Sequence, residues 1–544
     1  MEPHELAGKP PPQEILIDPA RIEKAYYEPA PSAVSPVKFG TSGHRGSPLK
    51  GEFCEPHVLA IVQAVCDCRA EQGVRGPLFL GRDTHAASEP ALRTAVEVLA
   101  ANQVPVFLQE RDRPTPTPAI SRLILRYNRQ APPSPADGLV VTPSHNPPED
   151  GGIKYNPPHG GPAETALTRR IEARANELLR EGNRNVRRVA YSEALRSGFV
   201  HMRDFTREYT ADLRLAVDLE AVRSAGVRIG VDPLGGASLD YWFAAAEAYR
   251  LNLEVVNPRL DPRFAFVRVD HDGKIRMDCS SPWAMRGLVE MKDRFDIAVG
   301  CDPDADRHGV VCPSMGLLNP NFYLAAAIDY LLERRQGWPP DGAVGKTLVT
   351  SALVDRVAAA WDRRLYETPV GFKWFAEGLH SSRLVFAGEE SAGASFLETA
   401  GAAWTTDKDG ILLGLAAAEL TARTGKDPGK RFLELADRHG RPYYTRVDLP
   451  IDAEQKERFT RIPPESLGLS TLGGEPVERL LDRAPGNDQP IGGFKAVTAG
   501  GWFAVRPSGT ENILKFYAES LKDPEHLSVI MEEAKTTVLR ALQA

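Results

Sequence analysis

Short apolar runs recur along the chain, and each of them ends abruptly in a polar loop. Residues 139–141, 295–300 and 384–387 form strand-like apolar runs, and helix-like patterns such as 165–181 and 412–423 alternate with them. Short buried strands that alternate with amphipathic helices are typical of α/β sheets. The pattern therefore predicts three similar α/β domains with mixed or parallel sheets.

The C-terminal part of the chain has a different pattern. Strand-like stretches at 494–497, 503–505 and 514–517 are followed by one amphipathic helix over 524–542. Strands that are grouped together and followed by a helix indicate an α+β fold. We predict a smaller α+β domain here, which gives four domains with limits at 1–203, 204–313, 314–440 and 441–544.

Composition restricts the class of protein. A chain of 544 residues is too long for one hydrophobic core, and its net charge of −7 gives no support to nucleic-acid binding. The six cysteines show no paired zinc spacing, so we expect a reduced, cytoplasmic setting. No stretch approaches the ~20 apolar residues of a membrane span, and the N-terminal residues do not resemble a signal peptide.

A serine follows the first apolar run. Ser144, His145 and Asn146 come directly after Thr-Pro, and a Gly-Gly turn then leads to Lys154. The carboxyl ends of strands are where open α/β sheets bind ligands, and a serine at such a place can act as a nucleophile. A Ser-Pro-rich surface turn would contain the same residues, so this loop alone leaves both interpretations open.

Three aspartates at alternate positions follow the second run. Asp302, Asp304 and Asp306 repel one another unless a cation neutralises them, and hard oxygen ligands suit magnesium or calcium better than zinc. An EF-hand needs a glutamate at the twelfth loop position, which here is Pro313. Magnesium completes its shell with water or substrate phosphate, so the loop predicts a magnesium site beside a phosphate. The alternative is a solvated acidic turn.

Two further loops contain groups that suit a sugar phosphate. Glu389 and Glu390 follow the third run, where paired glutamates are poor strand and core residues but can accept hydrogen bonds from sugar hydroxyls. Arg506 opens the segment Arg-Pro-Ser-Gly-Thr, a plausible oxyanion cradle that lacks the Walker spacing. Single cations beside other strand-end loops are candidate counter-charges for phosphate: Arg45, Lys373 and Lys408.

Together these loops resemble those of one family, the α-D-phosphohexomutases. That family carries the motifs Thr-Ser-Gly-x-Arg-Gly, Thr-x-Ser-His-Asn-Pro, Asp-x-Asp-x-Asp-Arg, Gly-Glu-x-Ser and Arg-Pro-Ser-Gly-Thr-Glu, and all five occur here in the same order. The sugar loop Gly-Glu-Glu-Ser-Ala-Gly looks most like that of the bacterial, glucose-specific α-phosphoglucomutases. The resemblance implies that the four domains surround a central cleft.

The resemblance also implies a reaction. It is the reversible interconversion of α-D-glucose 1-phosphate and glucose 6-phosphate through a phosphoserine enzyme and bound glucose 1,6-bisphosphate. Ser144 would carry the phosphate, and one magnesium ion would be held by that group with the three aspartates. Lys154 would be the general acid/base with a lowered pKa, and His145 an alternative base or an orienting group. The implied catalytic residues are Ser144, Lys154, His145, Arg45 and Arg307.

The remaining implied contacts are with a hexose phosphate substrate. The implied substrate-binding residues are Glu389, Ser391, Gly371, Lys373, Lys408, Arg506, Ser508, Gly509 and Thr510. His308 is interpreted first as a packing residue and second as a ligand contact. Three alternatives stay open: activity on mannose or glucosamine phosphates, hydrolysis of a sugar phosphate, and a catalytically inactive sugar-phosphate-binding paralogue. We expect a monomer or homodimer.

Overall fold

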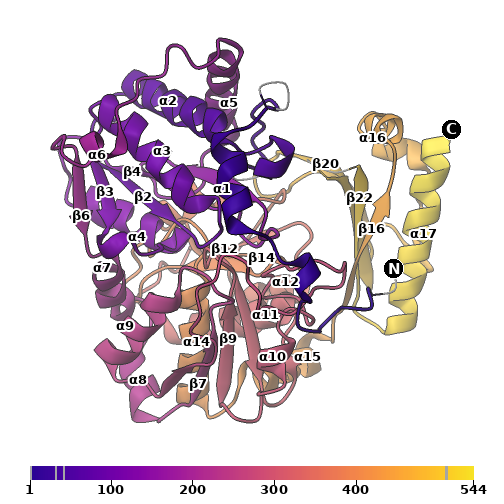
Figure 1. The fold of residues 1–544 in the computed structure, drawn as a ribbon. Helices are drawn as coiled ribbons and strands as arrows, with labels where there is room; N and C mark the ends of the chain where they lie inside the picture. The colour runs from indigo at the N-terminus through magenta and orange to yellow at the C-terminus, as the bar shows by residue number, and fades with distance from the viewer. Residues whose placement is uncertain (1–2, 31–33, 41–42, 509–511, 544) are drawn as a thin grey trace.

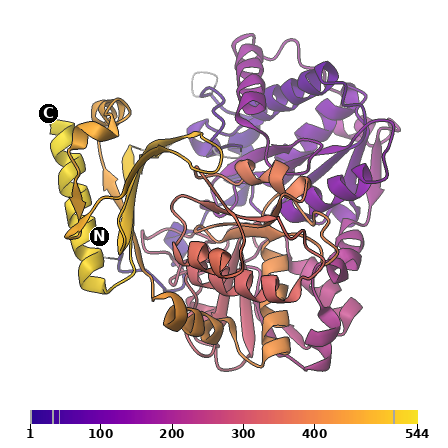
Figure 2. The same ribbon diagram turned by 180° about the vertical axis from the view of Figure 1, so that it is seen from behind.

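The chain folds into three α/β units packed into one body and a fourth unit at its side. The computed structural model describes residues 3–30, 34–40, 43–508 and 512–543. Figures 1 and 2 show the fourth unit in gold and yellow, apart from the purple, magenta and orange body. We number the units I to IV in chain order. Among the described helices, none combines the length and apolar character needed to cross a membrane.

Each α/β unit is built on its own sheet. The strands of unit I are β1 (His44–Gly46), β2 (Leu78–Arg82), β3 (Val106–Gln109), β4 (Asp137–Val141), β5 (Gly151–Asn156) and β6 (Val200–Arg203). Those of unit II are β7 (Ile229–Asp232), β8 (Leu253–Val255), β9 (Ile297–Cys301), β10 (His308–Cys312) and β11 (Gly316–Leu317). Those of unit III are β12 (Ala343–Thr347), β13 (Leu365–Thr368), β14 (Leu384–Glu389) and β15 (Gly393–Phe396).

The three sheets share one topology. The strand orders are β5-β4-β2-β3, β10-β9-β7-β8 and β15-β14-β12-β13, with β1, β6 and β11 added at edges. In each sheet the second to fourth strands of this order run parallel, and the first is antiparallel. β4, β9 and β14 are buried along their whole length, which explains why they read as short apolar runs.

A hairpin loop therefore follows the equivalent strand in each of the three α/β units, namely β4, β9 and β14. These are the loops at 142–150, 302–307 and 390–392, and they hold Ser144, the three aspartates and Ser391, while Glu389 is the last residue of β14. Each loop turns through a residue that is not glycine and yet has positive φ: Ser144 (61°), Ala305 (53°) and Ala392 (69°). Such conformations are uncommon, so the repeat is structural as well as topological.

Helices cover both faces of these sheets. In unit I they are α1 (Pro19–Tyr27), α2 (Glu55–Glu71), α3 (Ser88–Ala101), α4 (Thr117–Asn128), α5 (Thr165–Arg180) and α6 (Tyr191–Ala194). In unit II they are α7 (Phe205–Asp212), α8 (Leu219–Ser224), α9 (Leu239–Tyr249) and α10 (Arg286–Val289). In unit III they are α11 (Pro320–Arg334), α12 (Leu353–Ala360), α13 (Lys373–His380), α14 (Gly410–Thr424) and α15 (Pro428–His439).

Helix α14 joins units II and III. It packs against β9 and β10 of one sheet and β15 of the other, and its apolar side chains belong to a core shared by both units. Gly414 allows this close approach, because a Cβ there would lie 2.6 Å from Val299. The helix begins at the cap residue Asp409, whose side chain accepts hydrogen bonds from the Leu412 amide and the Trp404 ring. The start of α14 therefore fixes the loop before it, which carries Lys408.

Unit IV is antiparallel throughout its main sheet. Its strands are β16 (Tyr443–Pro450), β19 (Arg479–Arg483), β20 (Pro490–Val497), β21 (Gly501–Pro507) and β22 (Ile513–Ser520), in the order β16-β22-β21-β20-β19. The other elements are α16 (Ala453–Phe459), α17 (Pro524–Gln543) and the small hairpin of β17 (Thr471–Leu472) and β18 (Glu475–Pro476). Helix α17 covers one face of the sheet and closes a separate core.

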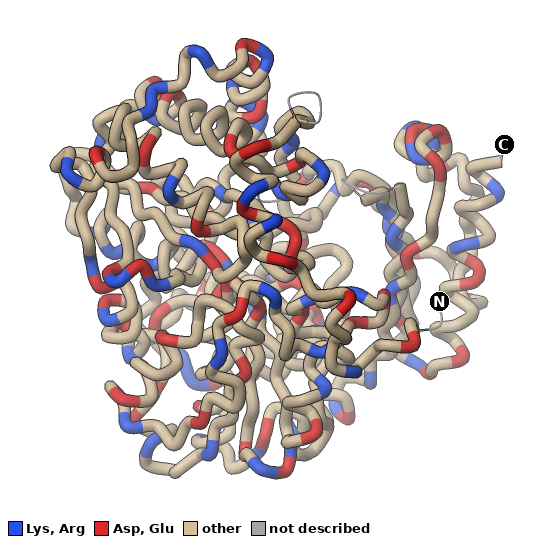
Figure 3. The backbone as a smooth tube through the Cα atoms, viewed as in Figure 1, with Lys and Arg blue, Asp and Glu red and all other residues tan. Residues whose placement is uncertain are grey.

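The predicted fold class is confirmed. The structure has three α/β units with mixed sheets and a smaller α+β unit, and the predicted helices at 165–181, 412–423 and 524–542 correspond to α5, α14 and α17. The predicted domain limits stay a prediction; β11 belongs to the second sheet although it lies beyond the limit at 313. Figure 3 shows acidic and basic residues interspersed over all four units in this view.

Candidate active site

The loops of units I and II meet, and their candidate residues are in contact. The Ser144 hydroxyl donates a hydrogen bond to Asp302 Oδ2 at 2.7 Å. Lys154, which β5 returns to the same place, donates from Nζ to Asp304 Oδ2 at 2.6 Å and to Asp306 Oδ2 at 3.0 Å. Ser144 is 1% exposed and Lys154 3% exposed. The structure therefore brings the serine, the lysine and the aspartates into one buried cluster.

The three aspartates form a ligand set suited to a divalent cation. Their carboxylate oxygens lie within 4.8 Å of one another, and all three side chains are buried. The Oδ1 atoms of Asp304 and Asp306 are buried without a hydrogen-bond partner among the described residues. Burial and the two neighbouring carboxylates raise the pKa of Asp302 well above its ordinary value. Buried carboxylate oxygens that accept no hydrogen bond fit Mg²⁺, which takes hard oxygen ligands.

The structure corrects one prediction about Lys154. Burial alone lowers the pKa of its amine, but Asp304 and Asp306 raise it, and the net pKa lies above the ordinary lysine value. The predicted lowering of this pKa is therefore wrong for the arrangement seen here, because two carboxylates at hydrogen-bond distance outweigh burial. Lys154 holds its proton while these contacts persist.

A second strand-end loop, which the sequence motifs did not reveal, supports the Ser144 loop. The amide of Ser144 donates to Thr142 Oγ1 at 2.8 Å, and that hydroxyl donates to Asp83 Oδ2 at 2.6 Å. His85 contacts Asp83 Oδ2 through Nδ1 at 2.8 Å and the Asn146 carbonyl through Nε2 at 3.1 Å. Asp83 and His85 follow the buried strand β2. The rule that identified Ser144, namely that functional residues follow the carboxyl ends of strands, could therefore also have found them.

His145 and Arg307 lie at the edge of the same cluster. His145 Nδ1 is 3.4 Å from the Ser144 hydroxyl, and burial followed by the charge of Arg307 lowers the pKa of its ring well below the usual value. His145 is therefore neutral near pH 7. The Arg307 amide donates to Asp302 Oδ1 at 3.0 Å, and its guanidinium lies 3.8 Å from Asp306.

Arg45 and Asp278 complete the charges around the aspartates. Arg45 lies on β1 opposite Gly152 of β5, and burial lowers the pKa of its guanidinium although Asp304 and Asp306 act to raise it. Burial likewise lowers the pKa of Arg307, but Asp278 and then Asp306 raise it, and the net value lies above the ordinary one. Asp278 was not singled out from the sequence, since it lies in an irregular segment without a motif.

The sugar loop of unit III reaches this cluster through Lys408. Glu389 ends β14, is 4% exposed and accepts a hydrogen bond from the Gly371 amide at 3.0 Å. Burial raises the pKa of Glu389 to about 7. Lys408 Nζ lies 3.0 Å from Asp306 Oδ2 and also acts on the Glu389 carboxyl. Ser391 lies in the turn between β14 and β15. Lys408 therefore connects the aspartates to the sugar loop.

Lys373 has a different environment. Its Nζ donates to Thr165 Oγ1 of unit I at 2.9 Å and lies 5.3 Å from the centre of the Trp374 ring. Burial and the nearby Arg169 lower the pKa of Lys373. The structure thus places Lys373 at the junction of units I and III, and its role as a substrate contact stays a prediction.

The residues predicted to clamp a phosphate lie on unit IV. Arg506 is on β21, with its guanidinium 3.4 Å from the Tyr517 hydroxyl. Ser508 is 4% exposed, and its amide donates to the Ile513 carbonyl at 2.9 Å. Gly509 and Thr510 lie outside the described residues. Arg506 and Ser508 therefore lie on a different unit from the Ser144 cluster, and their role as a clamp stays a prediction.

His308 is a packing residue in this structure. It is the first residue of β10, and both ring nitrogens are buried without a hydrogen-bond partner in the described part of the chain. The ring packs edge-on against Tyr323 with 5.1 Å between centroids, and burial lowers its pKa to about 3. A neutral ring between β10 and α11 agrees with the first interpretation of this residue.

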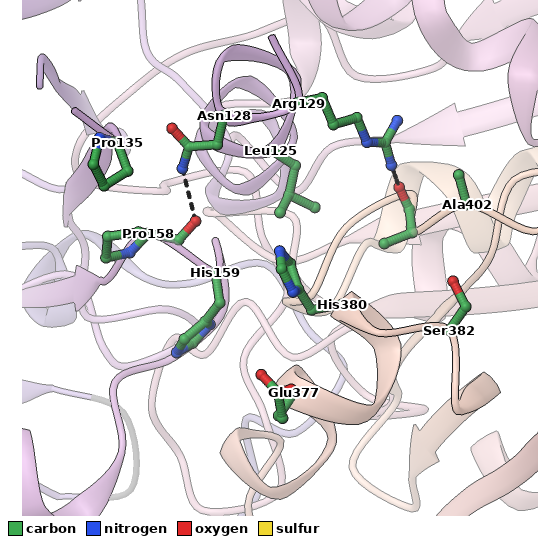
Figure 4. Close-up of a pocket in the computed structure, with 11 residues that line it drawn as sticks. Leu125, Asn128, Arg129, Pro135, Pro158, His159, Glu377, His380, Ser382 and Ala402 are labelled. Carbon is green, nitrogen blue, oxygen red and sulfur yellow. Dashed lines mark hydrogen bonds between the residues drawn. The ribbon is translucent and has the colours of Figure 1, made fainter. Parts of the chain in front are cut away.

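A cavity between units I and III lies apart from these groups. It has a volume of about 580 Å³ and lies between α4 and α13 (Figure 4). Two of its polar side chains are engaged by the protein: Asn128 donates to the Pro158 carbonyl, and Arg129 to the Ala403 carbonyl. Among the described residues, none of those that line the cavity belongs to a group able to hold a metal ion, so the aspartate site is the better candidate for phosphate chemistry.

Sequence models of known families match the chain in four places. They describe the phosphoglucomutase/phosphomannomutase alpha/beta/alpha domain I over residues 36–181, domain II over 207–316, domain III over 319–439 and the C-terminal domain over 473–536. The four matches follow the order of the four units.

Individual relatives agree with these matches. A phosphoglucomutase of Komagataeibacter xylinus is 52% identical over 536 residues, which cover 98% of this chain and 97% of the relative. Phosphoglucomutase 1 of Saccharomyces cerevisiae is 27% identical, with 89% and 90% of the two chains covered. A putative phosphomannomutase from Thermus thermophilus has the same fold, with a TM-score of 0.73 at 24% identity over 93% of this chain and 100% of that one. The prediction from the five motifs is confirmed: this chain belongs to the phosphoglucomutase/phosphomannomutase family of enzymes, the α-D-phosphohexomutases.

Proposed function

We propose that this protein is a phosphoglucomutase that interconverts α-D-glucose 1-phosphate and glucose 6-phosphate through a phosphoserine at Ser144. The observation that carries the proposal is the buried contact of the Ser144 hydroxyl with Asp302, beside Lys154 and the other two aspartates. A serine in such a cluster can hold a phosphoryl group, because cations and metal-binding carboxylates surround it. The K. xylinus relative, also a phosphoglucomutase, supports glucose phosphates as the substrate.

Asp302, Asp304 and Asp306 would hold one magnesium ion together with the phosphate on Ser144. The Oδ1 atoms of Asp304 and Asp306, which accept no hydrogen bond from the described residues, support this assignment. When bound, Mg²⁺ neutralises the charge that develops on a transferring phosphoryl group. Arg307 lies beside the metal ligands and Arg45 faces the same carboxylates, so both would stabilise that charge further.

Lys154 is the candidate for proton transfer to and from the substrate hydroxyl. It is within hydrogen-bond distance of two aspartates, which keep it protonated, so in this state it would act as a general acid. His145 is neutral and 3.4 Å from the serine hydroxyl, which suits an orienting partner. These roles differ in their starting protonation state and can therefore be separated by the variants Lys154→Met and His145→Gln.

The sugar must be bound in two orientations, because its positions 1 and 6 must each reach Ser144, one in each of the two transfers. We assign the sugar to Glu389, Ser391, Lys408, Gly371 and Lys373, and the distal phosphate to Arg506, Ser508, Gly509 and Thr510. The contact of Lys408 with Asp306 supports a sugar site next to the reacting phosphate. Glucose 1,6-bisphosphate would be the intermediate that turns between the two transfers.

The proposal is tested by turnover of glucose 1-phosphate with and without magnesium and glucose 1,6-bisphosphate. We expect turnover to need both, and to exceed the rates on mannose 1-phosphate and glucosamine 1-phosphate. The variant Ser144→Ala should not turn over glucose 1-phosphate, and the mass of the intact protein should lack one phosphate group. Ser238→Ala, a serine equally buried in unit II, should keep both the turnover and the phosphate. A faster rate on glucosamine 1-phosphate would overturn the substrate assignment, and full activity of Ser144→Ala would overturn the mechanism.

A further inference from the structure

Units III and IV meet at a small mixed interface. The segment after β12 and the strand β13 contact the sheet face of unit IV that α17 does not cover, and Leu348, Val349, Trp502 and Tyr517 form a small core there. Figures 1 and 2 both show the sheet of unit IV between α17 and the rest of the molecule. Apolar contact of this size leaves the orientation of two bodies weakly defined, because hydrophobic attraction has no direction.

A buried ion pair crosses this interface. Lys495 of β20 donates from Nζ to Glu367 Oε1 of β13 at 2.8 Å and to the Leu348 carbonyl at 2.6 Å. Its Nζ also lies 4.5 Å from the centre of the Trp502 ring. Lys495 is 4% exposed and Glu367 6% exposed. Buried charges that lose their partner are strongly unfavourable, so this pair allows few relative positions of the two units.

Other directional contacts surround the pair. The Gly486 amide donates to the Glu367 carbonyl at 2.7 Å, and a Cβ at Gly486 would lie 2.6 Å from that oxygen. On the other side of the pair, the Ala352 amide donates to Glu519 at 2.8 Å, and the Tyr444 hydroxyl donates to the Val349 carbonyl at 3.1 Å. Lys346 of β12 adds a second cation 4.0 Å from Glu367. The interface is thus fixed by polar contacts of defined direction.

The ion pair lies between the two loops that would hold one substrate. On the side of unit IV, Lys495 is opposite Ala504 in the sheet, and Ala504 leads directly to Arg506 on β21. On the side of unit III, β13 leads from Glu367 to Gly371, whose amide binds Glu389. A shift at the pair would therefore change the distance between the sugar loop and the phosphate loop.

We propose that Lys495 and Glu367 are positioning residues that set the spacing between Glu389 in the sugar loop of unit III and Arg506 on β21 of unit IV. This inference rests on the proposed function for its effect on catalysis. The pair would affect the binding of the distal phosphate through the position of Arg506, and its removal would leave the Ser144 cluster in units I and II intact. Loss of the pair should therefore weaken substrate binding, while the phosphorylation of Ser144 continues.

The main test is the variant Lys495→Met, which keeps the length of the side chain and removes its charge. Glu367 then keeps Lys346 as a partner, so the protein should still fold. We expect the KM for glucose 1-phosphate to rise at least tenfold, with the phosphate content of Ser144 unchanged. The double variant with Glu367→Gln removes both charges and should show the same rise in KM.

The matched control is Glu419→Gln. Glu419 is 1% exposed and pairs with Arg335 at 2.6 Å in the core shared by units II and III, away from this interface. The variant Glu419→Gln should lower the Tm at least as much as Lys495→Met does, and its KM should stay within twofold of the wild-type value. If Lys495→Met also leaves KM within twofold, the proposal is overturned.

A distance measurement separates this inference from the proposed function. The described cysteines are all buried, so spin labels on Leu433→Cys of α15 and Val529→Cys of α17, both exposed positions, report the spacing of units III and IV. We expect Lys495→Met to broaden or shift this distance in the full chain. An unchanged distance overturns the positioning role, whatever substrate the enzyme uses. A wild-type protein without glucose 1-phosphate turnover overturns the proposed function, while the distance still decides the positioning of the units.

Discussion

The Ser144 cluster and the phosphate loop around Arg506 are held in different ways. Ser144, Lys154 and the aspartates come from units I and II, are almost fully buried and are bonded to one another across the two units. Arg506 lies on an antiparallel unit with its own core, and that unit meets unit III through a small interface. In the proposed function the reacting groups must stay fixed, whereas the residues around Arg506 must hold the distal phosphate while the sugar is bound in either of two orientations. The two regions therefore divide chemistry from recognition.

The largest expected effect is the loss of magnesium from the fixed cluster. A bound cation contributes several kcal/mol to phosphoryl transfer, so chelation should lower turnover by more than about 10³-fold. Magnesium at about 100 times its Kd should also stabilise the folded protein by about 2.7 kcal/mol, visible as a higher Tm. Asp304→Asn should lose this rise in Tm. Asp272→Asn should keep it, because the group of Asp270, His271 and Asp272 is exposed at its last two residues. Unchanged turnover after chelation would contradict the metal site.

The next effect concerns the phosphate loop. Arg506→Ala removes a charge-assisted contact worth about 1.5–3 kcal/mol, so the KM for glucose 1-phosphate should rise about 10- to 100-fold. The phosphate on Ser144 should remain, because the cluster that holds it is in other units. Arg461→Ala, an arginine of the same unit whose side chain is 74% exposed, is the control and should leave KM unchanged. A fall in kcat with unchanged KM would place Arg506 in the chemistry and remove the contrast between the regions.

A smaller effect should come from the support of the Ser144 loop. Asp83 accepts hydrogen bonds from Thr142 and His85 and so helps to hold Ser144 at a positive φ. A residue in such a conformation stores about 1–3 kcal/mol, which its surroundings must offset. Asp83→Asn should lower kcat about tenfold with little change in KM. The control Asp112→Asn changes a side chain that is 61% exposed, and it should leave both kcat and KM unchanged. A rise in KM alone would show that Asp83 does not act through the serine loop.

The sequence was most informative where a buried strand determines the place of the loop after it. Runs such as 139–141 and 295–300 predict buried strands, and the polar residues after them must lie at the carboxyl edge of a sheet. Ser144 and the three aspartates could be found in this way. That Lys154 returns to them requires β5 to run antiparallel to β4. The two glycines predicted to form the turn are instead the first residues of β5, and the chain turns before them.

Contacts between distant segments were not accessible in the same way. The pKa of Lys154 depends on how two carboxylates approach it through space, and no pattern of residues along the chain measures that distance. The contact of Lys373 with Thr165 joins residues of different units, and the pairing of Lys495 with Glu367 likewise depends on how unit IV packs on unit III. Motifs identify groups within a loop, and packing decides their partners and charge.

The smallest expected effect tests how the sugar loop takes part in recognition. Burial raises the pKa of Glu389 to about 7, so near neutral pH the side chain changes from a carboxylic acid to a carboxylate. The carboxylate forms above this pKa and accepts stronger hydrogen bonds from hydroxyls, by about 1 kcal/mol. The KM for glucose 1-phosphate should therefore fall about fivefold between pH 6 and pH 8. The substrate phosphate also titrates near pH 6, and this affects the KM of the wild type and of Glu389→Gln alike, whereas the variant lacks the carboxyl group. The ratio of the two KM values at each pH isolates Glu389, and a ratio that is constant from pH 6 to pH 8 would show that its ionisation plays no part in binding the sugar.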